Sequence, residues 1–136
     1  MKREDCIFCK IAQGEIPSKT IYEDDTFRVI LDLGPVTRGH ALILPKEHAE
    51  NIFELSEDIA GKAMVLAKHL AVVMRDRLHC SGLNLVQNNG VSAGQTVPHF
   101  HLHMIPRYEG NGKDLNWKAG EATQEELEAV RRQITQ

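Results

Sequence analysis

The sequence predicts an α+β fold, with an antiparallel sheet of about five strands, one long central helix and a C-terminal helix. Short runs of β-branched and aromatic residues lie on both sides of one long segment with helical periodicity. Strands and helices do not alternate strictly, as they would in a doubly wound fold with a parallel sheet. No linker divides the 136 residues, so we expect a single domain over residues 1–136.

Three strands are expected before the long helix. A proline turn in "EIPSKTIYEDD" precedes a short edge strand, and "TFRVILDL" predicts a second strand that ends near Gly34 and Pro35. The third strand is "HALILPK", which Pro45 stops. The segment "GPVTRG" between the second and third strands has turn composition, which predicts that these two strands pair antiparallel.

The long helix is expected from Ser56 to about His79. Ser56 is suited to the N-cap position, and Glu57 and Asp58 suit the positive end of the helix dipole. Apolar residues recur at spacings of three and four along one face, and they are Ile59, Ala63, Met64, Ala67, Leu70, Met74 and Leu78.

Two strands and a final helix complete the predicted order. The segment "GLNLVQN" predicts a short strand, "NGVSAG" a glycine-bearing loop, and "VPHFHLHMIP" the last strand. The segment "TQEELEAVRRQI" predicts a C-terminal helix, in which Thr123 and Glu126 are placed for a capping box. The apolar side of that helix is expected to hold Leu127, Val130 and Ile134.

Charge and hydropathy exclude some partners and locations. A net charge of -3 argues against a nucleic-acid surface built on bulk charge. The start "MKREDCIFCK" has no apolar core of signal-peptide length, and "AMVLAKHLAVVM" is too short and too often interrupted to span a bilayer. Three cysteines are an odd number, which does not favour a disulfide framework. We therefore expect a cytoplasmic protein without a nucleic-acid or membrane partner.

The segment "HFHLHM" places three histidines at alternate positions. In a strand, His99, His101 and His103 share one surface, and the apolar residues between them share the opposite, buried surface. Neighbouring histidines on one face would lie roughly 7 Å apart, so one zinc ion could bridge an adjacent pair but not all three.

The loop before this strand points to phosphate chemistry. In "NNGVSAGQT", Gly90 and Gly94 permit close backbone approach, and several N–H groups could face a phosphate beside the side chains of Gln95 and Thr96. A neutral imidazole nitrogen of His101 could then attack phosphorus and expel a leaving group.

The segment "HFHLHMI" resembles the His-φ-His-φ-His-φ-φ signature of the histidine triad superfamily, where φ is apolar. Further matches are "IFCKIAQGEIPSKTIYEDD", "GHALILPKEH", "QNNG" and "GQTV". The superfamily consists of small nucleotide-binding hydrolases and transferases that pass a nucleoside monophosphate through a histidine. The resemblance also implies a homodimer whose two sheets join into one.

The resemblance implies a role for each matching residue. His101 is expected to be the nucleophile, His103 to contact phosphate and orient the site, and Asp32 to hold the ribose hydroxyls. The contacts to phosphate and leaving group are expected from Asn88, Gly94, Gln95 and Thr96. The apolar slot for the base is expected to consist of Ile7, Phe8, Ile11, Ile16, Leu31 and Leu33.

The segment "CIFC" separates Cys6 and Cys9 by a spacing that lets both thiolates reach one metal ion. From the spacing alone, a redox pair, half of a metal site and coincidence all remain open. The chain also resembles a zinc-containing branch of the superfamily, which adds His48 and His99 as the other two ligands. A closed site with four protein ligands would be structural, and no organic cofactor is expected.

The resemblance implies hydrolysis of a purine nucleotide at its α-phosphorus through a covalent nucleotidyl-histidine. The N-terminal half resembles the Hint-like branch, which cleaves nucleoside phosphoramidates, and we expect that activity. "GQTV" and "HMIPR" also resemble the branch that cleaves dinucleoside polyphosphates, so that activity is an alternative. Two other hypotheses are a nucleotide-binding scaffold with incidental hydrolysis and a zinc hydrolase whose metal-bound water is held by His99 and His101.

Overall fold

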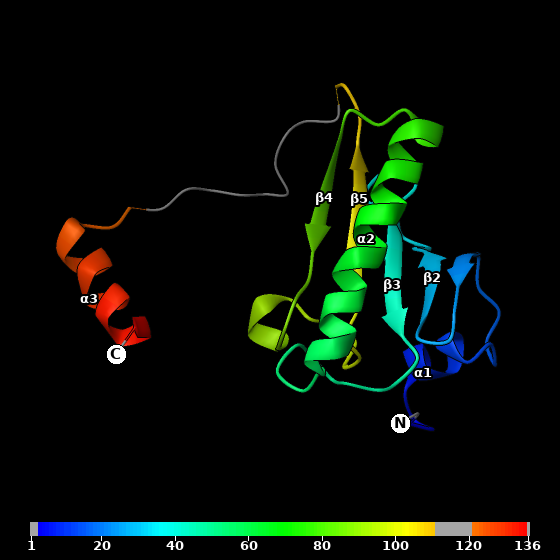
Figure 1. Cartoon of the computed structure of the whole chain (residues 1–136), viewed down its shortest axis with the longest axis horizontal. Helices are drawn as coiled ribbons and strands as arrows, with labels where there is room; N and C mark the ends of the chain where they lie inside the picture. Colours follow the sequence, from blue (N-terminus) through cyan, green and yellow to red (C-terminus); the bar gives the residue numbers. More distant parts are fainter. Residues whose placement is uncertain (1–2, 111–120, 136) are drawn as a thin grey trace.

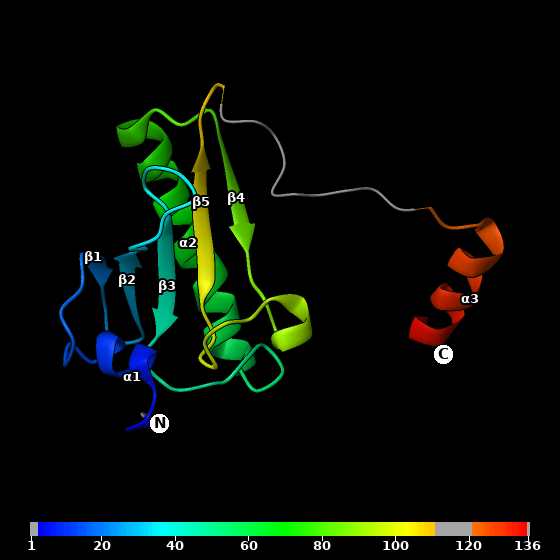
Figure 2. The ribbon, with the colours of Figure 1, turned by 180° about the vertical axis from the view of Figure 1, so that it is seen from behind.

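A five-stranded sheet forms the centre of the protein in a computed structural model, which describes residues 3–110 and 121–135 without the side chains of residues 130 and 133–135. The long helix α2 lies against one face of the sheet, and the short helix α1 lies at one end of the opposite face (Figures 1 and 2). The strands are β1 (Thr20–Glu23), β2 (Phe27–Leu31), β3 (Ala41–Pro45), β4 (Gly82–Val86) and β5 (Leu102–Arg107). The helices are α1 (Ile7–Ala12), α2 (Glu57–Leu78), the 3-10 helix η1 (Val91–Ala93) and α3 (Gln124–Thr135).

The sheet is antiparallel throughout, in the order β1-β2-β3-β5-β4. This confirms the predicted α+β class, the edge position of β1 and the pairing of β2 with β3. Strand β3 is central, and all five of its residues are buried. Strand β4 forms the second edge of the sheet.

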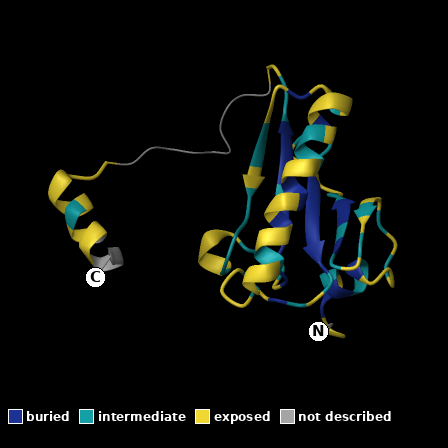
Figure 3. Ribbon diagram, in the orientation of Figure 1, coloured by how far each residue is buried: buried dark blue, intermediate teal, exposed yellow. Residues whose placement is uncertain are grey.

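Each face of the sheet carries its own apolar layer. Towards α2 the buried residues are Phe27, Val29, Ala41, Ile43, Ala63, Leu66, Ala67, Met74, Phe100, Leu102 and Met104. Towards α1 the buried residues are Ala12, Ile30, Leu42 and Leu44, with Phe8 and Ile11 packed against them. Figure 3 shows that the central strands are buried, whereas the outward side of α2 is exposed. Because alternate strand residues point to opposite faces, β3 serves both layers.

Helix α2 confirms the predicted boundaries. The hydroxyl of Ser56 accepts the Ile59 N–H at 3.2 Å, and His79 ends the helix in the left-handed conformation, with φ of 57°. The prediction was wrong for Met64, whose side chain is 55% exposed. Met64 directly follows the buried Ala63, so it points about 100° away from it around the helix axis. Leu66 occupies the buried face instead.

Strand β5 begins later than predicted, at Leu102. Pro98 has no N–H, the His99 N–H donates to the carbonyl of Val97 at 2.8 Å, and the Phe100 N–H donates to that of Ala49 at 2.7 Å. These bonds replace ladder bonds, so His99 and His101 precede the strand rather than belonging to it. The expected burial of the apolar residues between the histidines is confirmed.

Helix α1 was not predicted from the sequence. It has six residues, fewer than two turns, so no apolar period could reveal it. Its N-cap is Cys6, whose sulfur accepts the Cys9 N–H at 3.3 Å. The thiols of the "CIFC" motif therefore also organise the helix that carries them.

Helix α3 has the predicted capping box. The Glu126 N–H donates to the Thr123 hydroxyl and the Thr123 N–H donates to the Glu126 carboxylate, each at 3.1 Å. Leu127 is half exposed, and the side chains of Val130 and Ile134 lie outside the described residues. Among the helices of residues 3–110 and 121–135, none has both the length and the apolar character that a membrane crossing would need.

Candidate active site and metal centre

Four polar side chains meet near strands β2, β3 and β5, and we call Asp32, His40, His101 and His103 the reactive cluster. Asp32 follows β2, His40 precedes β3, and His101 directly precedes β5. His103 lies opposite Leu42 in the pairing of β5 with β3, and Leu42 belongs to the layer on the α1 side. The reactive cluster therefore occupies the face of the sheet opposite α2.

The tautomer of His101 follows from its hydrogen bond. Its Nδ1 lies 2.7 Å from the backbone carbonyl of His99. A carbonyl oxygen can only accept, so Nδ1 carries the proton and donates it. The Nε2 of the neutral ring then keeps its lone pair, as a nucleophile or base requires.

A second hydrogen-bonded chain fixes His103. The Val36 N–H donates to Nδ1 of His40 at 3.0 Å, so the proton of the neutral His40 ring is on Nε2. That N–H donates to Nδ1 of His103 at 2.9 Å. His103 consequently carries its own proton on Nε2, as a donor for a bound ligand. Its ring centroid is 5.0 Å from that of His101.

Asp32 completes the reactive cluster. One carboxylate oxygen lies 3.6 Å from Nε2 of His40, and the other accepts the Gly34 N–H at 2.8 Å. By distance alone, Asp32, His40 and His103 could share a metal ion, since their ligand atoms lie within 4.8 Å of one another. The Val36 N–H argues against this, because it needs the Nδ1 lone pair of His40 and so keeps the proton on Nε2. The trio is better described as a proton-donating chain.

Burial keeps the histidines of the reactive cluster neutral. Loss of hydration, together with the neighbouring rings of His101 and His40, lowers the pKa of His103 to about 4, while the charge of Asp32 opposes this shift. Burial also lowers the pKa of His101 and of His40, and the charge of Asp32 opposes both shifts. At neutral pH the rings of His101, His40 and His103 are therefore uncharged.

The loop between β4 and β5 is braced by one side chain. The Gln95 amide oxygen accepts the Gly90 N–H at 2.7 Å, while its nitrogen donates to the carbonyls of Glu50 at 2.6 Å and Val97 at 2.9 Å. Both amide protons of Gln95 are therefore used within the fold. Gly90 and Gly94 adopt φ of 93° and 91°, a region that disfavours side chains.

The other residues expected to hold phosphate belong to this loop region. Thr96 is exposed just before the histidines, and Asn88 is half-buried after β4. The Asn88 side-chain nitrogen lies 3.9 Å from the position that a Cβ would take at Gly94. The structure thus brings Asn88 and Gly94 together.

An apolar cavity of about 350 Å³ opens beside α1. Its lining residues are Ile7, Ile11, Ile16, Pro17, Ser18, Lys19, Ile30, Leu31 and Leu33. Of the six residues expected to form the base slot, five line this cavity. The sixth, Phe8, lies outside the lining and instead contacts the rings of His99 and His101.

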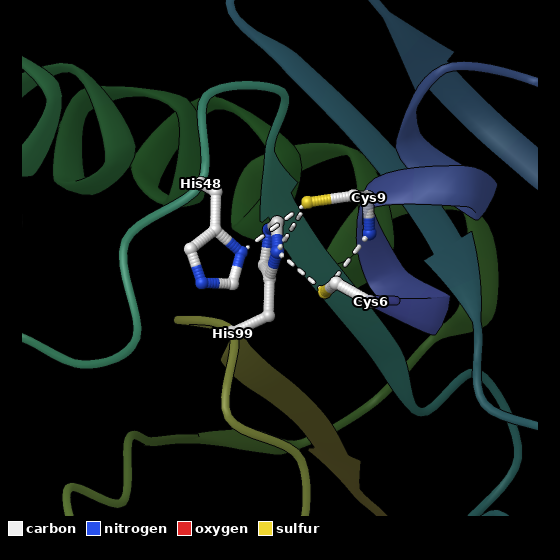
Figure 4. A group of neighbouring side chains, drawn as sticks. All are labelled: Cys6, Cys9, His48 and His99. Atoms are coloured by element: carbon white, nitrogen blue, oxygen red, sulfur yellow. Dashed lines mark hydrogen bonds between the residues drawn. The ribbon is translucent and has the colours of Figure 1, made fainter. Parts of the chain in front are cut away.

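Cys6, Cys9, His48 and His99 converge from α1, from the segment after β3 and from the segment before β5, and we call them the thiol–histidine cluster (Figure 4). Nδ1 of His99 lies 3.3 Å from the Cys6 sulfur and 3.5 Å from the Cys9 sulfur. Nδ1 of His48 lies 3.2 Å from the Cys9 sulfur. One ligand atom from each residue falls within 4.8 Å of all the others, and the cluster is largely buried.

The chemistry of this donor set fits zinc. Nε2 of His99 lies 2.9 Å from the carbonyl of Pro45, so it carries the proton and leaves the Nδ1 lone pair facing both thiols. A histidine ligand with its other N–H on a carbonyl is the usual outer arrangement of a zinc site. Burial lowers the pKa of His99 to about 4 and also lowers that of His48, which favours neutral rings. Burial raises the pKa of the Cys9 thiol, and a bound cation would lower this pKa again.

The sequence did not reveal the contact of His40 with His103. The available signal is the position of His40, which directly precedes a strand that pairs with the histidine strand. That pairing becomes visible only when the strand order is known. The "HxHxH" pattern alone therefore does not identify the whole reactive cluster, because His40 comes from the segment just before β3.

Comparison with known proteins shows the family to which this chain is similar. A model of the HIT domain family matches residues 13–110. Protein hit of Bacillus subtilis (strain 168) is 45% identical over 116 residues, which cover 85% of this chain and 80% of that protein. An adenosine 5'-monophosphoramidase of Saccharomyces cerevisiae is 38% identical over 130 residues, which cover 95% of this chain and 80% of that enzyme.

A similar solved structure is described as a zinc-bound histidine triad family protein from Mycobacterium smegmatis. It is 35% identical, with a TM-score of 0.77, and the match covers 96% of this chain and 95% of that chain.

Proposed function

Because the chain belongs to the HIT domain family, we propose that it is a nucleotide hydrolase that cleaves purine nucleoside 5'-phosphoramidates at the α-phosphorus. The similar yeast enzyme is named for the same reaction on an adenosine phosphoramidate. The observation that carries the proposal is the free Nε2 of His101, which the carbonyl of His99 leaves unprotonated.

In the first step, the lone pair of His101 Nε2 forms a bond to the α-phosphorus while the bond from phosphorus to the leaving nitrogen breaks. The leaving nitrogen keeps the electron pair, accepts a hydrogen bond from His103 Nε2–H and takes up a proton from solvent as it leaves. His101 is then bonded to phosphorus through Nε2, and its ring carries the positive charge. Water attacks the phosphorus, the bond to Nε2 breaks with its electron pair returning to His101, and a proton is released to solvent.

The donor chain favours a phosphoramidate over a dinucleoside polyphosphate. An amine leaves well only when it is protonated, whereas a polyphosphate leaves as a stable anion. The chain from the Val36 N–H through His40 to His103 holds the Nε2–H of His103 as a hydrogen-bond donor to that nitrogen. A site that cleaves polyphosphates would gain less from a hydrogen-bond donor at the leaving group.

The remaining roles concern binding. The cavity lined by Ile7, Ile11, Ile16, Leu31 and Leu33 suits an apolar, flat base. Asp32, close to the catalytic rings, accepts from the ribose hydroxyls, and the amide of Gly94 with Asn88 and Thr96 faces the phosphate. We assign to Gln95 the role of bracing this loop rather than the role of a direct hydrogen-bond donor to phosphate, since both its amide protons are already used.

We further propose that Cys6, Cys9, His48 and His99 hold a structural zinc ion. A closed site of four protein ligands supplies cross-linking and leaves no position for a reactive water. His101 lies outside this set, which argues against a hydrolase whose metal-bound water is held by His99 and His101. The zinc site would fasten α1 to the segment that leads into β5.

Two protomers are proposed to join at the β4 edges. An edge strand offers unpaired backbone groups, and Leu85 of β4 is 41% exposed. On the neighbouring helix α2, the exposed Met64, Val65 and Val73 add apolar surface. Light scattering of the purified protein should give twice the mass of the chain.

The test is to trap the intermediate. Purified protein is mixed with an adenosine phosphoramidate labelled on phosphorus, quenched in milliseconds and digested. We expect the label on His101, and no label in His101→Ala, which still binds nucleotide. A diadenosine polyphosphate is assayed in parallel.

The outcomes separate the alternatives. Label on His101 with preferred cleavage of the polyphosphate would overturn the choice of substrate. Tight nucleotide binding without turnover of either compound would favour a scaffold. Turnover without any protein-bound label, abolished reversibly by a chelator, would favour a zinc hydrolase.

A further inference from the structure

Phe8 contacts one histidine of the thiol–histidine cluster and one of the reactive cluster. It sits on α1 between Cys6 and Cys9, and its ring centroid lies 5.0 Å from that of His101, with an angle of 85° between the planes. The same ring lies 6.0 Å from His99, at 81°. Both values describe edge contacts between aromatic rings. The two cysteines that flank Phe8 in the sequence contact His99 through their sulfur atoms.

We propose that Phe8 is a positioning residue, which holds the ring of the nucleophile His101 at the angle needed for attack. The inference rests on the proposed function, because it gives Phe8 a task within that reaction. It replaces the base-slot role that the sequence suggests for Phe8. Phe8 would act through His101 and would not touch the base.

The ring of His101 needs a second constraint. Its hydrogen bond to the His99 carbonyl fixes the position of Nδ1, but a single bond leaves the ring able to tilt about it. An edge contact from Phe8 restricts that tilt and keeps water from the ring, which is 5% exposed. The direction of the Nε2 lone pair then follows from two contacts, the hydrogen bond at Nδ1 and the Phe8 ring.

Phe8 can restrain His101 only if α1 is itself fixed. At its C-terminal end, Nε of Arg28 donates to the carbonyl of Ala12 at 3.1 Å, and Gln13 donates to that of Lys46 at 3.2 Å. Phe8 and Ile11 pack against the buried layer of β2 and β3. At the N-terminal end, the thiols of the thiol–histidine cluster hold the helix. Phe8 is therefore presented by a helix that is anchored at both ends.

The two roles of Phe8 predict different kinetics. A base-slot residue contributes to binding in the ground state and the transition state alike, so its loss raises KM. A positioning residue contributes only when the nucleophile reacts, so its loss lowers kcat with KM nearly constant. Ile16, which lines the apolar cavity, is the matched control for the first behaviour.

The experiment compares Phe8→Leu, Phe8→Tyr and Ile16→Ala with the unaltered protein. Phe8→Leu keeps apolar bulk but loses the flat ring, and we expect kcat to fall about fivefold to tenfold, with KM within about twofold. Phe8→Tyr keeps the ring edge and should restore kcat. Ile16→Ala should raise KM, with kcat changed less. A normal kcat in Phe8→Leu, or a loss carried by KM, would overturn the inference.

A spectroscopic measurement tests the same contact without turnover. The Hε1 proton of His101 should show a ring-current shift that is lost in Phe8→Leu and kept in Phe8→Tyr, while that of the exposed His79 stays unchanged. An unchanged His101 signal in Phe8→Leu would contradict the contact, even if that variant were less stable. The trapping experiment separates the two proposals. Absence of label on His101 defeats the proposed reaction, whereas label on His101 with a normal kcat in Phe8→Leu defeats only the role of Phe8.

Discussion

In the thiol–histidine cluster the carbonyl of Pro45 accepts from Nε2 of His99, whereas in the reactive cluster the carbonyl of His99 accepts from Nδ1 of His101. Both rings are buried and neutral, and they are separated by one residue. In each ring a backbone carbonyl selects which nitrogen keeps its lone pair. The free Nδ1 of His99 faces two thiols, and the free Nε2 of His101 is left for phosphorus. The position of a carbonyl, rather than the residue type, therefore separates the proposed metal ligand from the proposed nucleophile.

The two clusters are also linked. His99 contributes its side chain to one and its carbonyl to the other, and α1 presents thiols to the first and Phe8 to the second. A change in the thiol–histidine cluster should therefore affect stability first and rate second. A change in the reactive cluster should affect the rate or the binding of substrate more than stability.

The largest effect is expected from His101→Ala. We expect turnover to fall at least about a thousandfold, because no other group supplies the nucleophile, while nucleotide affinity changes little. Rapid-quench kinetics and equilibrium binding measure the two quantities. His69→Ala, at an exposed position of α2, is the matched histidine control and should behave like the unaltered protein.

Cys9→Ala tests the thiol–histidine cluster. We expect loss of bound zinc and a fall in the free energy of unfolding of roughly 2 to 4 kcal/mol, because a tightly bound ion stabilises only the folded state. Metal analysis and denaturant titration check this. A chelator should destabilise the unaltered protein and leave Cys9→Ala unaffected.

Cys80→Ala is the control for Cys9→Ala. Cys80 is also buried, but it follows α2 and lies outside the four residues of the thiol–histidine cluster. Its substitution should leave the zinc content unchanged. Equal zinc loss in both variants would show that the thiol–histidine cluster is not the metal site.

His40→Ala should separate the donor chain from the nucleophile. Removing the donor to His103 should slow cleavage of an aliphatic phosphoramidate roughly tenfold to a hundredfold, since its amine needs a proton to leave. A phosphoramidate of an aromatic amine needs that proton less and should lose less. Equal losses on both substrates would mean that His40 only supports the fold.

The smallest effect is expected in the pH profile of Asp32→Asn. The charge of Asp32 opposes the lowering of the pKa of His40 and of His103 by burial. Without that charge both pKa values fall further, so the neutral donor chain persists to lower pH. The acid limb of kcat/KM should therefore shift to lower pH, although KM rises through the lost ribose contact. An acid limb that moves to higher pH would contradict this assignment.

The strands and the long helix could be predicted because their signals are local. β-branched runs, turn residues and the Ser56 cap lie within the segments that they define. Helix α1 could not be predicted, because it has six residues and its cap is a cysteine. The predicted start of β5 was wrong because the carbonyl of Ala49, which is distant in sequence, accepts a hydrogen bond from the Phe100 N–H.

The sequence named most of the residues that the structure brings together, but not which ring nitrogen of each histidine carries the proton. The resemblance named His99 and His101 with different roles, yet both are histidines beside apolar neighbours. Their free nitrogens depend on the Pro45 and His99 carbonyls, and the proton on His40 depends on the Val36 amide. Only the folded chain brings these groups together.

The proposed roles of His99 and His101 depend on which nitrogen of each ring carries the proton, and nitrogen NMR of ¹⁵N-histidine protein reports this directly. Spectra at neutral pH should show His101 with the proton on Nδ1 and a bare Nε2, and His99 with the proton on Nε2 and Nδ1 directed at the thiols. If His101 instead carried its proton on Nε2, or its Nε2 showed the shift of a metal ligand, the nitrogen proposed to attack phosphorus would not be free.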